Sequence, residues 1–450
     1  ACSWINCTFT SQTQFMIQLF LSRLGISQLN PMQQAASAAI QEGRNVVLLS
    51  PTGSGKTLAF LLPLLEMFDK DRRGVQALIL APSRELVLQI EQVFKKLQTG
   101  FKVNSCYGGH PVSTQRNNLK EPPVLLIGTP GRIADHIRRE HVDLTGVHTL
   151  VLDEFDKSLE LGFQKEMEFI TGRLDNLSTR ILTSATNIGV IPGFTGVINP
   201  EILDFTMNTG PAQLQLKAVR SAGADKLETL FNLVCSLKEE ASLIFCNHRE
   251  AVERISGHLQ KAGLTHGAYH GGMEQEDREL ALIRFRNGTH HILLTTDLAS
   301  RGLDIPEIRH VIHYQFPVTE TSWTHRNGRT ARMHASGVAW LVMAGDERMP
   351  AFIKDEPQFV DVSPSPTLPE PSRWETIYIG LGKKDKLSRS DVAGFLMQKG
   401  GLDKDELGRI EILDYASFAA VSSEKVNRLL NRVAGEQIKK KTARIAVARK

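Results

Sequence analysis

The chain has 450 residues and a net charge of +4 at pH 7, with 41% hydrophobic and 23% charged residues. This length and composition predict about three domains, each able to bury an ordinary core. No apolar stretch reaches the roughly 18 uninterrupted residues that a membrane span needs, and no basic and then apolar start suggests a signal peptide. The five scattered cysteines form no CxxC pair, which argues against a disulfide framework or a structural metal. We expect a reduced, cytoplasmic protein.

The charge is unevenly distributed along the chain. Residues 373–450 carry 17 Lys and Arg against 10 Asp and Glu, so the rest of the chain is net negative. Such asymmetry indicates a C-terminal segment that meets a polyanion, although a solvated lysine-rich tail would have the same composition.

Short Val/Ile/Leu runs alternate with longer helical patterns from about residue 31 to residue 345. This alternation predicts parallel sheets in α/β layers. Two successive series imply two domains, residues 1–208 and 214–350. The predicted strands are 46–49, 77–80, 124–127, 150–152 and 180–183 in the first series, and 242–245, 268–269, 291–295, 310–314 and 338–343 in the second.

A Pro-rich stretch within residues 351–372 predicts a semi-rigid linker. Beyond it, residues 373–450 change to the pattern strand, helix, strand, strand, helix, strand. This order is expected of a small ferredoxin-like α+β domain. Its predicted elements are 376–379, 389–398, 409–413, 417–421, 424–433 and 443–447.

A glycine-rich loop follows the first predicted strand and precedes a predicted helix. Backbone N–H groups of such a loop can wrap phosphates, with Lys56 on the β- and γ-phosphates and the Thr57 hydroxyl on magnesium. Ser50 stands where the strict pattern has glycine, and a merely flexible loop is the alternative. The predicted ATP-binding residues are Ser50, Pro51, Thr52, Gly53, Ser54, Gly55, Lys56 and Thr57.

Three carboxylates follow the apolar run 149–152, at residues 153, 154 and 156. Buried charges must be paired or bound to metal. In nucleotide hydrolases an Asp here shares the magnesium with the loop Thr, so we assign Asp153 to the metal and Glu154 to the attacking water. An acidic helix start is the alternative.

Arginines recur every three residues at 326, 329 and 332. A helical turn would place all three on one face, where guanidinium groups could stabilise a transferring phosphoryl group. A solvated basic helix is the alternative. We expect hydrolysis to require closure of the two α/β domains.

These motifs together resemble the DEAD-box RNA helicases over about residues 9–345. The resemblance implies two tandem RecA-like domains, with Gln33 reading the adenine and Asp304 approaching the nucleotide. Arg329 and Arg332 would be arginine fingers, while Asp156, Ser184, Thr186 and Arg326 would couple hydrolysis to strand separation. The implied RNA contacts are Arg84, Gly109, Thr129, Arg132, Arg278 and Thr296.

Two features depart from the family pattern. The third letter of the DEAD tetrad is Phe155 instead of Ala, so the coupling of Asp156 to the motif at residues 184–186 could change. The first eight residues look unlike the usual start of the family.

The C-terminal segment resembles the RNA-binding domain of the DbpA group of these helicases, which acts on large-subunit ribosomal RNA. An RRM-like sheet stacks bases on exposed aromatics, for which Tyr378 and Phe418 are candidates, with core packing as the alternative. Because the aromatic pattern is poor, we expect more from the basic residues. These are Lys383, Lys384, Lys386 and Arg389.

The resulting prediction is an ATP- and magnesium-dependent RNA helicase that opens short duplexes of large-subunit ribosomal RNA during ribosome assembly. A non-catalytic RNA clamp is the rival outside enzymes, and a DNA translocase is the rival within them. Phe155 is the only feature that favours the clamp, whereas the glutamine at 33 and the C-terminal domain disfavour the translocase.

Overall fold

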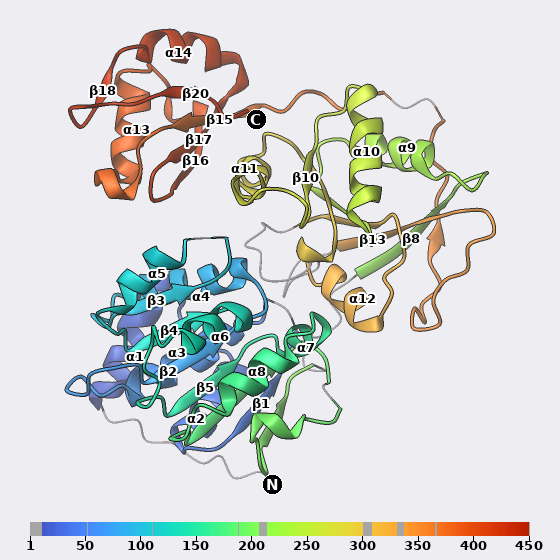
Figure 1. The fold of residues 1–450 in the computed structure, drawn as a ribbon. Helices are drawn as coiled ribbons and strands as arrows, with labels where there is room; N and C mark the ends of the chain where they lie inside the picture. Colours follow the sequence, from blue (N-terminus) through green and yellow to red (C-terminus); the bar gives the residue numbers. More distant parts are fainter. Residues whose placement is uncertain are drawn as a thin grey trace. The chain divides into compact units, whose positions relative to one another are not determined.

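The computed structural model describes residues 11–449 except 52, 110, 188, 207–213, 300–307, 331–336 and 365–366. The chain divides into two compact units near residue 210. The first contains one seven-stranded sheet, and the second contains a seven-stranded and a four-stranded sheet (Figure 1). Thr52, Asp304 and Arg332 of the predicted sites lie outside the described residues.

All strand pairs of the first sheet are parallel. The strand order is β3-β4-β2-β5-β6-β1-β7, so the carboxyl ends of all strands lie at one edge. The strands are β1 (Val46–Leu49), β2 (Ala77–Leu80), β3 (Val103–Cys106), β4 (Leu125–Gly128), β5 (Thr149–Leu152), β6 (Thr179–Ser184) and β7 (Glu201–Asp204).

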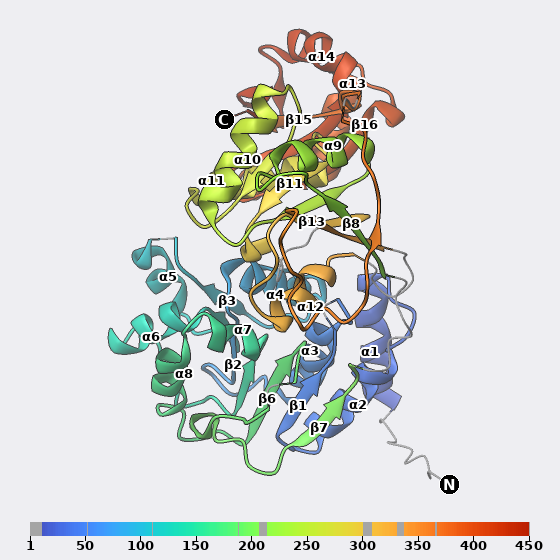
Figure 2. The same ribbon diagram turned by 90° about the vertical axis from the view of Figure 1, so that its right-hand side faces the viewer.

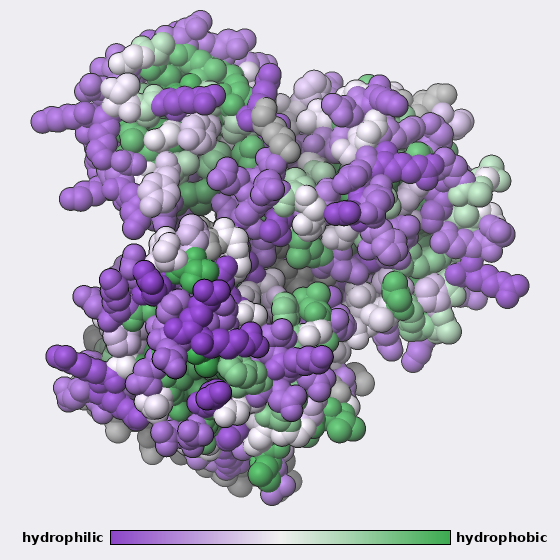
Figure 3. Space-filling view, viewed as in Figure 1, coloured by the Kyte–Doolittle hydropathy of each residue, from purple (hydrophilic) through white to green (hydrophobic). Residues whose placement is uncertain are grey.

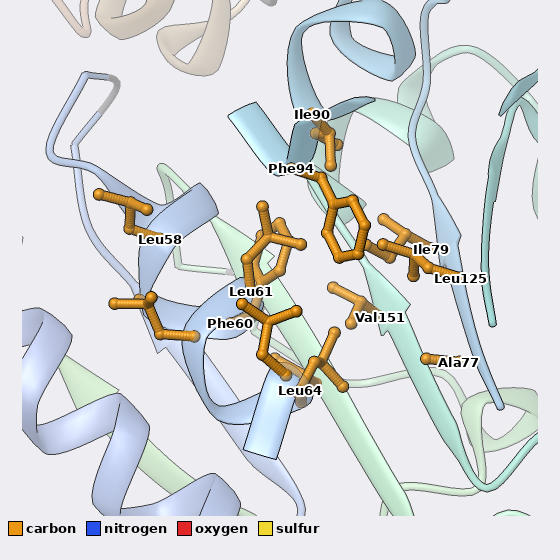
Figure 4. Close-up of a cluster of buried hydrophobic side chains, with 14 of the residues drawn as sticks. Leu58, Phe60, Leu61, Leu64, Ala77, Ile79, Ile90, Phe94, Leu125 and Val151 are labelled. Carbon is orange, nitrogen blue, oxygen red and sulfur yellow. The ribbon is translucent and has the colours of Figure 1, made fainter. Parts of the chain in front are cut away.

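Both faces of this sheet are covered, which explains why its strands are apolar without alternation. Along β2, Ala77 and Ile79 belong to one buried cluster while Leu78 and Leu80 belong to the other. Figure 4 shows the first cluster, where Phe94 and the leucines of α3 meet the sheet. The helices are α1 (Ser11–Leu24), α2 (Pro31–Gln41), α3 (Lys56–Met67), α4 (Arg84–Lys96), α5 (Val112–Leu119), α6 (Pro130–Arg138), α7 (Phe155–Glu160) and α8 (Gln164–Thr171).

Figure 2 shows β6, β1 and β7 side by side, with α2 next to this end of the sheet. The helix α2 contacts both α3 and β1. Because of this packing, the residues at the start of α2 lie beside the loop between β1 and α3.

The large sheet of the second unit is also entirely parallel, in the order β10-β11-β9-β12-β13-β8-β14. Its strands are β8 (Leu214–Arg220), β9 (Ser242–Phe245), β10 (Gly267–Tyr269), β11 (Ile292–Thr295), β12 (His310–His313), β13 (Gly337–Met343) and β14 (Gln358–Phe359). The helices are α9 (Leu227–Ser236), α10 (Arg249–Lys261), α11 (Gln275–Arg286) and α12 (Glu320–Asn327).

The C-terminal residues form an antiparallel sheet in the order β16-β17-β15-β20. Its strands are β15 (Trp374–Ile379), β16 (Leu407–Ile412), β17 (Ser417–Ser422) and β20 (Ile445–Val447). The helices α13 (Arg389–Gln398) and α14 (Val426–Val433) pack on one face, and a short hairpin joins β18 (Gln437–Ile438) to β19 (Lys441–Thr442). The predicted fold class, with two parallel α/β sheets and a small α+β region, is confirmed.

Candidate nucleotide and RNA sites

The loop between β1 and α3 is shaped to receive an anion. Gly55 begins α3 with φ of 90°, a left-handed conformation that favours glycine. Lys56 Nζ donates to the carbonyl oxygens of Ser50 at 2.6 Å and Pro51 at 3.0 Å. The ammonium group therefore lies against the loop's own backbone, beside the N-terminus of α3, where phosphate oxygens are favoured. Gly53 and Ser54 lie in this loop, and Thr57 lies in the first turn of α3.

Gln33 is in contact with this loop. Its Nε2 donates to the Gly55 carbonyl at 3.2 Å, and Asn30 Nδ2 donates to the Ser54 carbonyl at 3.0 Å. Asn30 and Gln33 also cap α2 reciprocally, since each side chain accepts from the other's backbone N–H. Sequence reasoning missed Asn30, although Asn followed three residues later by Gln is a capping-box signal.

Asp153 is buried at the end of β5. Its Oδ1 accepts from Thr183 Oγ1 at 2.5 Å. Burial raises the pKa of this carboxyl, while the Thr183 hydrogen bond and the charge of Lys56 oppose that increase. A buried carboxylate within reach of the charge of the loop lysine suits magnesium, which proteins hold with one or two carboxylates together with substrate phosphates. Asp153 and Thr57 therefore fit the predicted ion.

Glu154 follows in the left-handed conformation, with φ of 46°, at the start of α7. Its backbone N–H donates to Thr183 Oγ1 at 3.2 Å, and its side chain is buried. A non-glycine residue held at positive φ is costly and is often found at functional sites. Thr183, which contacts both acids, was missed by sequence reasoning. The available signal was a threonine at the carboxyl end of the predicted strand 180–183.

Asp156 is joined to the predicted coupling motif. Thr186 Oγ1 donates to Asp156 Oδ2 at 3.0 Å, and Ser184 Oγ contacts both the backbone N–H and the carbonyl of Thr186. Phe155 packs in the buried cluster on one side of the sheet, with its ring 6.2 Å from that of Phe194. Phe155, which is larger than the Ala of the family pattern, therefore fits in the core, and the Asp156–Thr186 hydrogen bond still forms.

Arg326 is fully buried in the second unit, where its guanidinium joins three strand ends. It donates to Asp297 after β11, to the Gln315 carbonyl after β12 and to Asn247 after β9, at 2.6 to 3.2 Å. The prediction that one helical turn carries all three arginines is wrong. The helix α12 ends at Asn327 with Gly328 as its C-cap, so Arg329 lies beyond it.

The predicted RNA contacts of the first unit gather at the carboxyl edge of its sheet. Arg84 begins α4, with its guanidinium 4.8 Å from the centre of the Tyr107 ring. A Cβ added to Gly109 would lie 3.0 Å from Arg84 Nη1. Thr129 and Arg132 lie at the N-terminus of α6, and the Thr129 N–H donates to the Cys106 carbonyl at 3.0 Å.

Two predicted RNA contacts lie in the second unit. Arg278 is in the first turn of α11 and donates through Nη2 to Gln275. Thr296 directly follows β11 and is half-buried.

The basic residues of the C-terminal sheet lie in two adjoining loops. Exposed Lys383, Lys384, Lys386 and Arg389 occupy the turn after β15 and the start of α13. Lys439 of the β18–β19 hairpin donates to the Lys386 carbonyl at 3.0 Å and pairs with Asp391 at 2.6 Å. The hydrogen bond from Lys439, together with those from the Ser388 hydroxyl and backbone N–H, lowers the pKa of Asp391 to about 2. We call Lys383, Lys384, Lys386, Arg389, Lys439, Lys440 and Lys441 the basic edge; hydrophilic side chains cover this region in Figure 3.

Tyr378 and Phe418 are direct partners on the central strands β15 and β17, with ring centres 5.6 Å apart. Their face is opposite to α13 and α14. Phe418 is only 7% exposed because it packs with Ile283 of α11 and Ala448. Arg286 pairs with Glu411 at 2.7 Å beside this cluster. In this structure, α11 of the second unit covers the aromatic face.

Family models match three successive parts of the chain: a DEAD/DEAH box helicase at residues 30–190, a helicase conserved C-terminal domain at 225–334, and a DbpA RNA-binding domain at 376–447. The ATP-dependent RNA helicase DbpA of Escherichia coli is 32% identical over 94% of this chain and 95% of that protein. The chain belongs to the DbpA-type DEAD-box ATP-dependent RNA helicases. Bacillus subtilis DbpA is 30% identical over 96% of this chain and 97% of that protein.

Solved structures agree with the fold of the helicase. Mss116p bound to ssRNA and AMP-PNP is 27% identical, with a TM-score of 0.66, over 74% of this chain and 72% of that one. Saccharomyces cerevisiae Dbp5 bound to RNA and ADP BeF3 has a TM-score of 0.67 over 77% of this chain and 93% of that one. At 24% identity, Dbp5 bears on the fold alone. Among the described residues, no helix is long and apolar enough to cross a membrane.

Proposed function

We propose that this RNA helicase acts in the cytoplasm on large-subunit ribosomal RNA or its precursor particle during ribosome assembly. The observation that carries the proposal is the basic edge, which lies in the part of the chain that matches the DbpA RNA-binding domain. Seven cationic side chains in two adjoining loops suit the phosphate backbone of a folded RNA.

In the ATP cycle, the first unit binds the nucleotide. Lys56 would hold the β- and γ-phosphates and Gln33 would read the base. Thr57 and Asp153 would hold magnesium, which would neutralise charge on the phosphates. Glu154 orients the attacking water. Arg329, Arg332 and Asp304 approach the nucleotide only when the two units close, so hydrolysis depends on RNA.

On the RNA side, Arg84, Gly109, Thr129 and Arg132 grip one strand of a short duplex, together with Arg278 and Thr296. Asp156, Ser184, Thr186 and Arg326 couple hydrolysis to bending of that strand. Backbone contacts of this kind carry no sequence information, so the choice of RNA rests with the C-terminal domain. That domain tethers the core near its target and raises the local concentration of duplex.

The basic edge has the features of a phosphate-binding surface. Lys386, Lys439 and Lys440 adopt positive φ, which costs energy for a residue with a side chain. Only Asp385 and Asp391 form the ion pairs found with this edge among the described residues. Stacking on Tyr378 and Phe418 stays a prediction that requires RNA to displace α11 from this face, so we base the proposal on the basic edge.

ATP turnover measured without nucleic acid, with DNA, with generic RNA and with large-subunit ribosomal RNA tests the proposal. We expect the last to stimulate turnover at the lowest concentration. Equal stimulation by all RNAs would remove the ribosomal assignment. Turnover independent of RNA would contradict RNA-dependent hydrolysis, and poor turnover with every nucleic acid would support the non-catalytic clamp.

A matched pair of variants assigns the effect to the basic edge. Replacing Lys383, Lys384 and Lys386 with Ala should weaken binding of ribosomal RNA by about tenfold or more, since each phosphate contact adds to affinity. Replacing Lys399 and Lys425, which pair with Glu436 at 3.2 Å and Glu406 at 2.7 Å, is the control in the same domain. Equal losses in both variants would contradict a specific role for the edge.

A further inference from the structure

Two buried polar residues of the first unit lie between the elements that carry its RNA contacts. Gln115 of α5 and His136 of α6 are 5% and 0% exposed. Neither belongs to a motif that the sequence analysis identified. A buried polar group is costly unless it is hydrogen-bonded, so their partners indicate what holds them there.

The hydrogen bonds fix the orientation of both side chains. Gln115 Nε2 donates to the Tyr107 carbonyl at 2.9 Å, so Gln115 Oε1 is the atom that faces His136 Nε2 at 3.0 Å. His136 Nε2 must therefore carry the proton. Burial lowers the pKa of His136 to about 4, so the ring is neutral and its bare Nδ1 accepts from Nδ1 of His141 at 3.2 Å.

The hydrogen bonds of Gln115 and His136 connect two segments that carry proposed RNA contacts. Tyr107 lies under the Arg84 guanidinium and precedes Gly109 by two residues. At the other end, His136 is one helical turn after Arg132 on α6. Figure 1 shows α4, α5 and α6 around the same end of the sheet.

Backbone contact alone fixes only the beginning of α6, through the Thr129 N–H and the Cys106 carbonyl. Packing on α8 also holds the last turn of α6, where the Arg138 guanidinium lies 4.7 Å from the centre of the Phe169 ring. The side-chain bonds of His136 join the same turn to α5. Without these bonds, α6 could shift relative to α5 and move Arg132 relative to Arg84.

We propose that Gln115 and His136 are positioning residues that hold the Arg84–Gly109 and Thr129–Arg132 contacts at the spacing of RNA phosphates. Neither side chain touches RNA. The inference rests on the proposed role of Arg84 and Arg132 in RNA binding.

The test uses the full chain, a short labelled oligoadenylate and a non-hydrolysable ATP analogue. Gln115→Leu should raise the Kd for the oligoadenylate about tenfold, the effect of losing a buried hydrogen bond in the positioning of a site, and leave the Kd for the nucleotide unchanged. His136→Gln, whose amide N–H can replace Nε2–H, should restore most of the affinity that His136→Phe loses.

Gln76→Leu is the matched control. Gln76 is a fully buried glutamine that bonds backbone atoms of Asp69 and Arg72, at the opposite end of β2 from Arg84. The Gln76→Leu variant should have a lower melting temperature, as the Gln115→Leu variant should, but an unchanged Kd for RNA. Equal RNA affinities in Gln115→Leu and the parent, or equal losses in Gln115→Leu and Gln76→Leu, would overturn the inference.

Arg84→Ala and Arg132→Ala separate this inference from the proposed RNA contacts. If both arginine variants weaken RNA binding and Gln115→Leu does not, the positioning role alone fails. If neither arginine variant weakens binding, the RNA contacts themselves are misassigned, and the inference falls with them. Nitrogen chemical shifts of His136 provide a direct check, since an Nδ1–H tautomer would contradict the hydrogen-bond pattern.

Discussion

The Thr186 hydroxyl donates to Asp156 Oδ2 at 3.0 Å, which joins the segment after β6 to the first turn of α7. Asp156 is two residues from Glu154, whose backbone N–H contacts Thr183 on β6. The acids at the end of β5 are thus hydrogen-bonded to β6 and to the segment after it. These bonds are the route by which we propose that a change at the nucleotide reaches the residues after β6.

Thr186→Val should separate the two activities of the helicase. Valine has the same shape as threonine and removes only the bond to Asp156, so we expect ATP turnover to persist while duplex unwinding falls about tenfold. Parallel assays of phosphate release and strand displacement measure the ratio of unwinding to ATP turnover. Thr171→Val is the control, at a half-buried site on α8 where the hydroxyl donates to the Glu168 carbonyl of the same helix. An equal ratio in both variants would contradict the coupling role.

Phe155→Ala should mainly affect stability. Its side chain is fully buried, so truncation should lower the free energy of unfolding of the first unit by about 3–5 kcal/mol. Urea denaturation gives this value. ATP turnover per folded molecule should stay within about twofold, because the Asp156–Thr186 bond does not involve the ring. A larger loss of turnover at full folding would show that Phe155 acts on the chemistry.

Gly55→Ala should abolish tight ATP binding. The added Cβ would lie 2.4 Å from Gln33 Nε2, at a φ that an alanine rarely adopts. Gly43→Ala imposes a similar positive φ with no atom within 4 Å, so it isolates backbone strain from the clash with Gln33. Fluorescent-nucleotide titration should show a loss of nucleotide affinity for Gly55→Ala and none for Gly43→Ala. Equal nucleotide affinities in the two variants would mean that Gln33 can move without affecting nucleotide binding.

Glu154→Gln should retain ATP binding and lose about 10²–10⁴-fold in turnover, since the amide cannot accept the proton of the attacking water. Single-turnover hydrolysis at saturating RNA measures the chemical step. Unchanged turnover would refute the assigned role.

Stability should fall as the pH falls from about 6.5, the ordinary pKa of histidine, toward 4. Burial lowers the pKa of His136 to about 4 and those of His290 and His313 to about 3. The unfolded chain therefore takes up protons in this range before the folded chain does. Denaturation at a series of pH values measures how steeply the free energy of unfolding depends on pH. His290→Leu should make this dependence shallower, because it removes one of the three low-pKa histidines. It should break no hydrogen bond of the ring, since neither ring nitrogen of His290 has a hydrogen-bond partner among the described residues.

The sequence predicted the central strands well because strands buried on both faces are uniformly apolar. It missed the edge strands β3 and β7, whose residues are mostly half-buried or exposed and lack an apolar run. It also missed β8, which begins at a predicted domain boundary and whose first four residues are half-buried or exposed. Edge strands depend on their neighbours for pairing, and the local pattern does not record those neighbours.

Motif residues of the nucleotide loop were predicted because their spacing along the chain is short. The partners of Arg326 were not, since Asp297, Gln315 and Asn247 follow three different strands. For the same reason, the Gln115–His136 bond has no local signal. Contacts between distant segments arise from the packing of the sheet, so the sequence indicates the residue types without the pairing.

The covered aromatic face bears on the choice of protein used in binding experiments. A fragment of residues 373–450 would leave Tyr378 and Phe418 facing solvent, whereas Ile283 of α11 packs on Phe418 in the whole chain. A truncated domain would thus present an apolar surface that the intact helicase conceals, and would also leave Glu411 without Arg286. Affinities measured on such a fragment would combine the basic edge with an artificial stacking platform, so full-length protein is the appropriate reference.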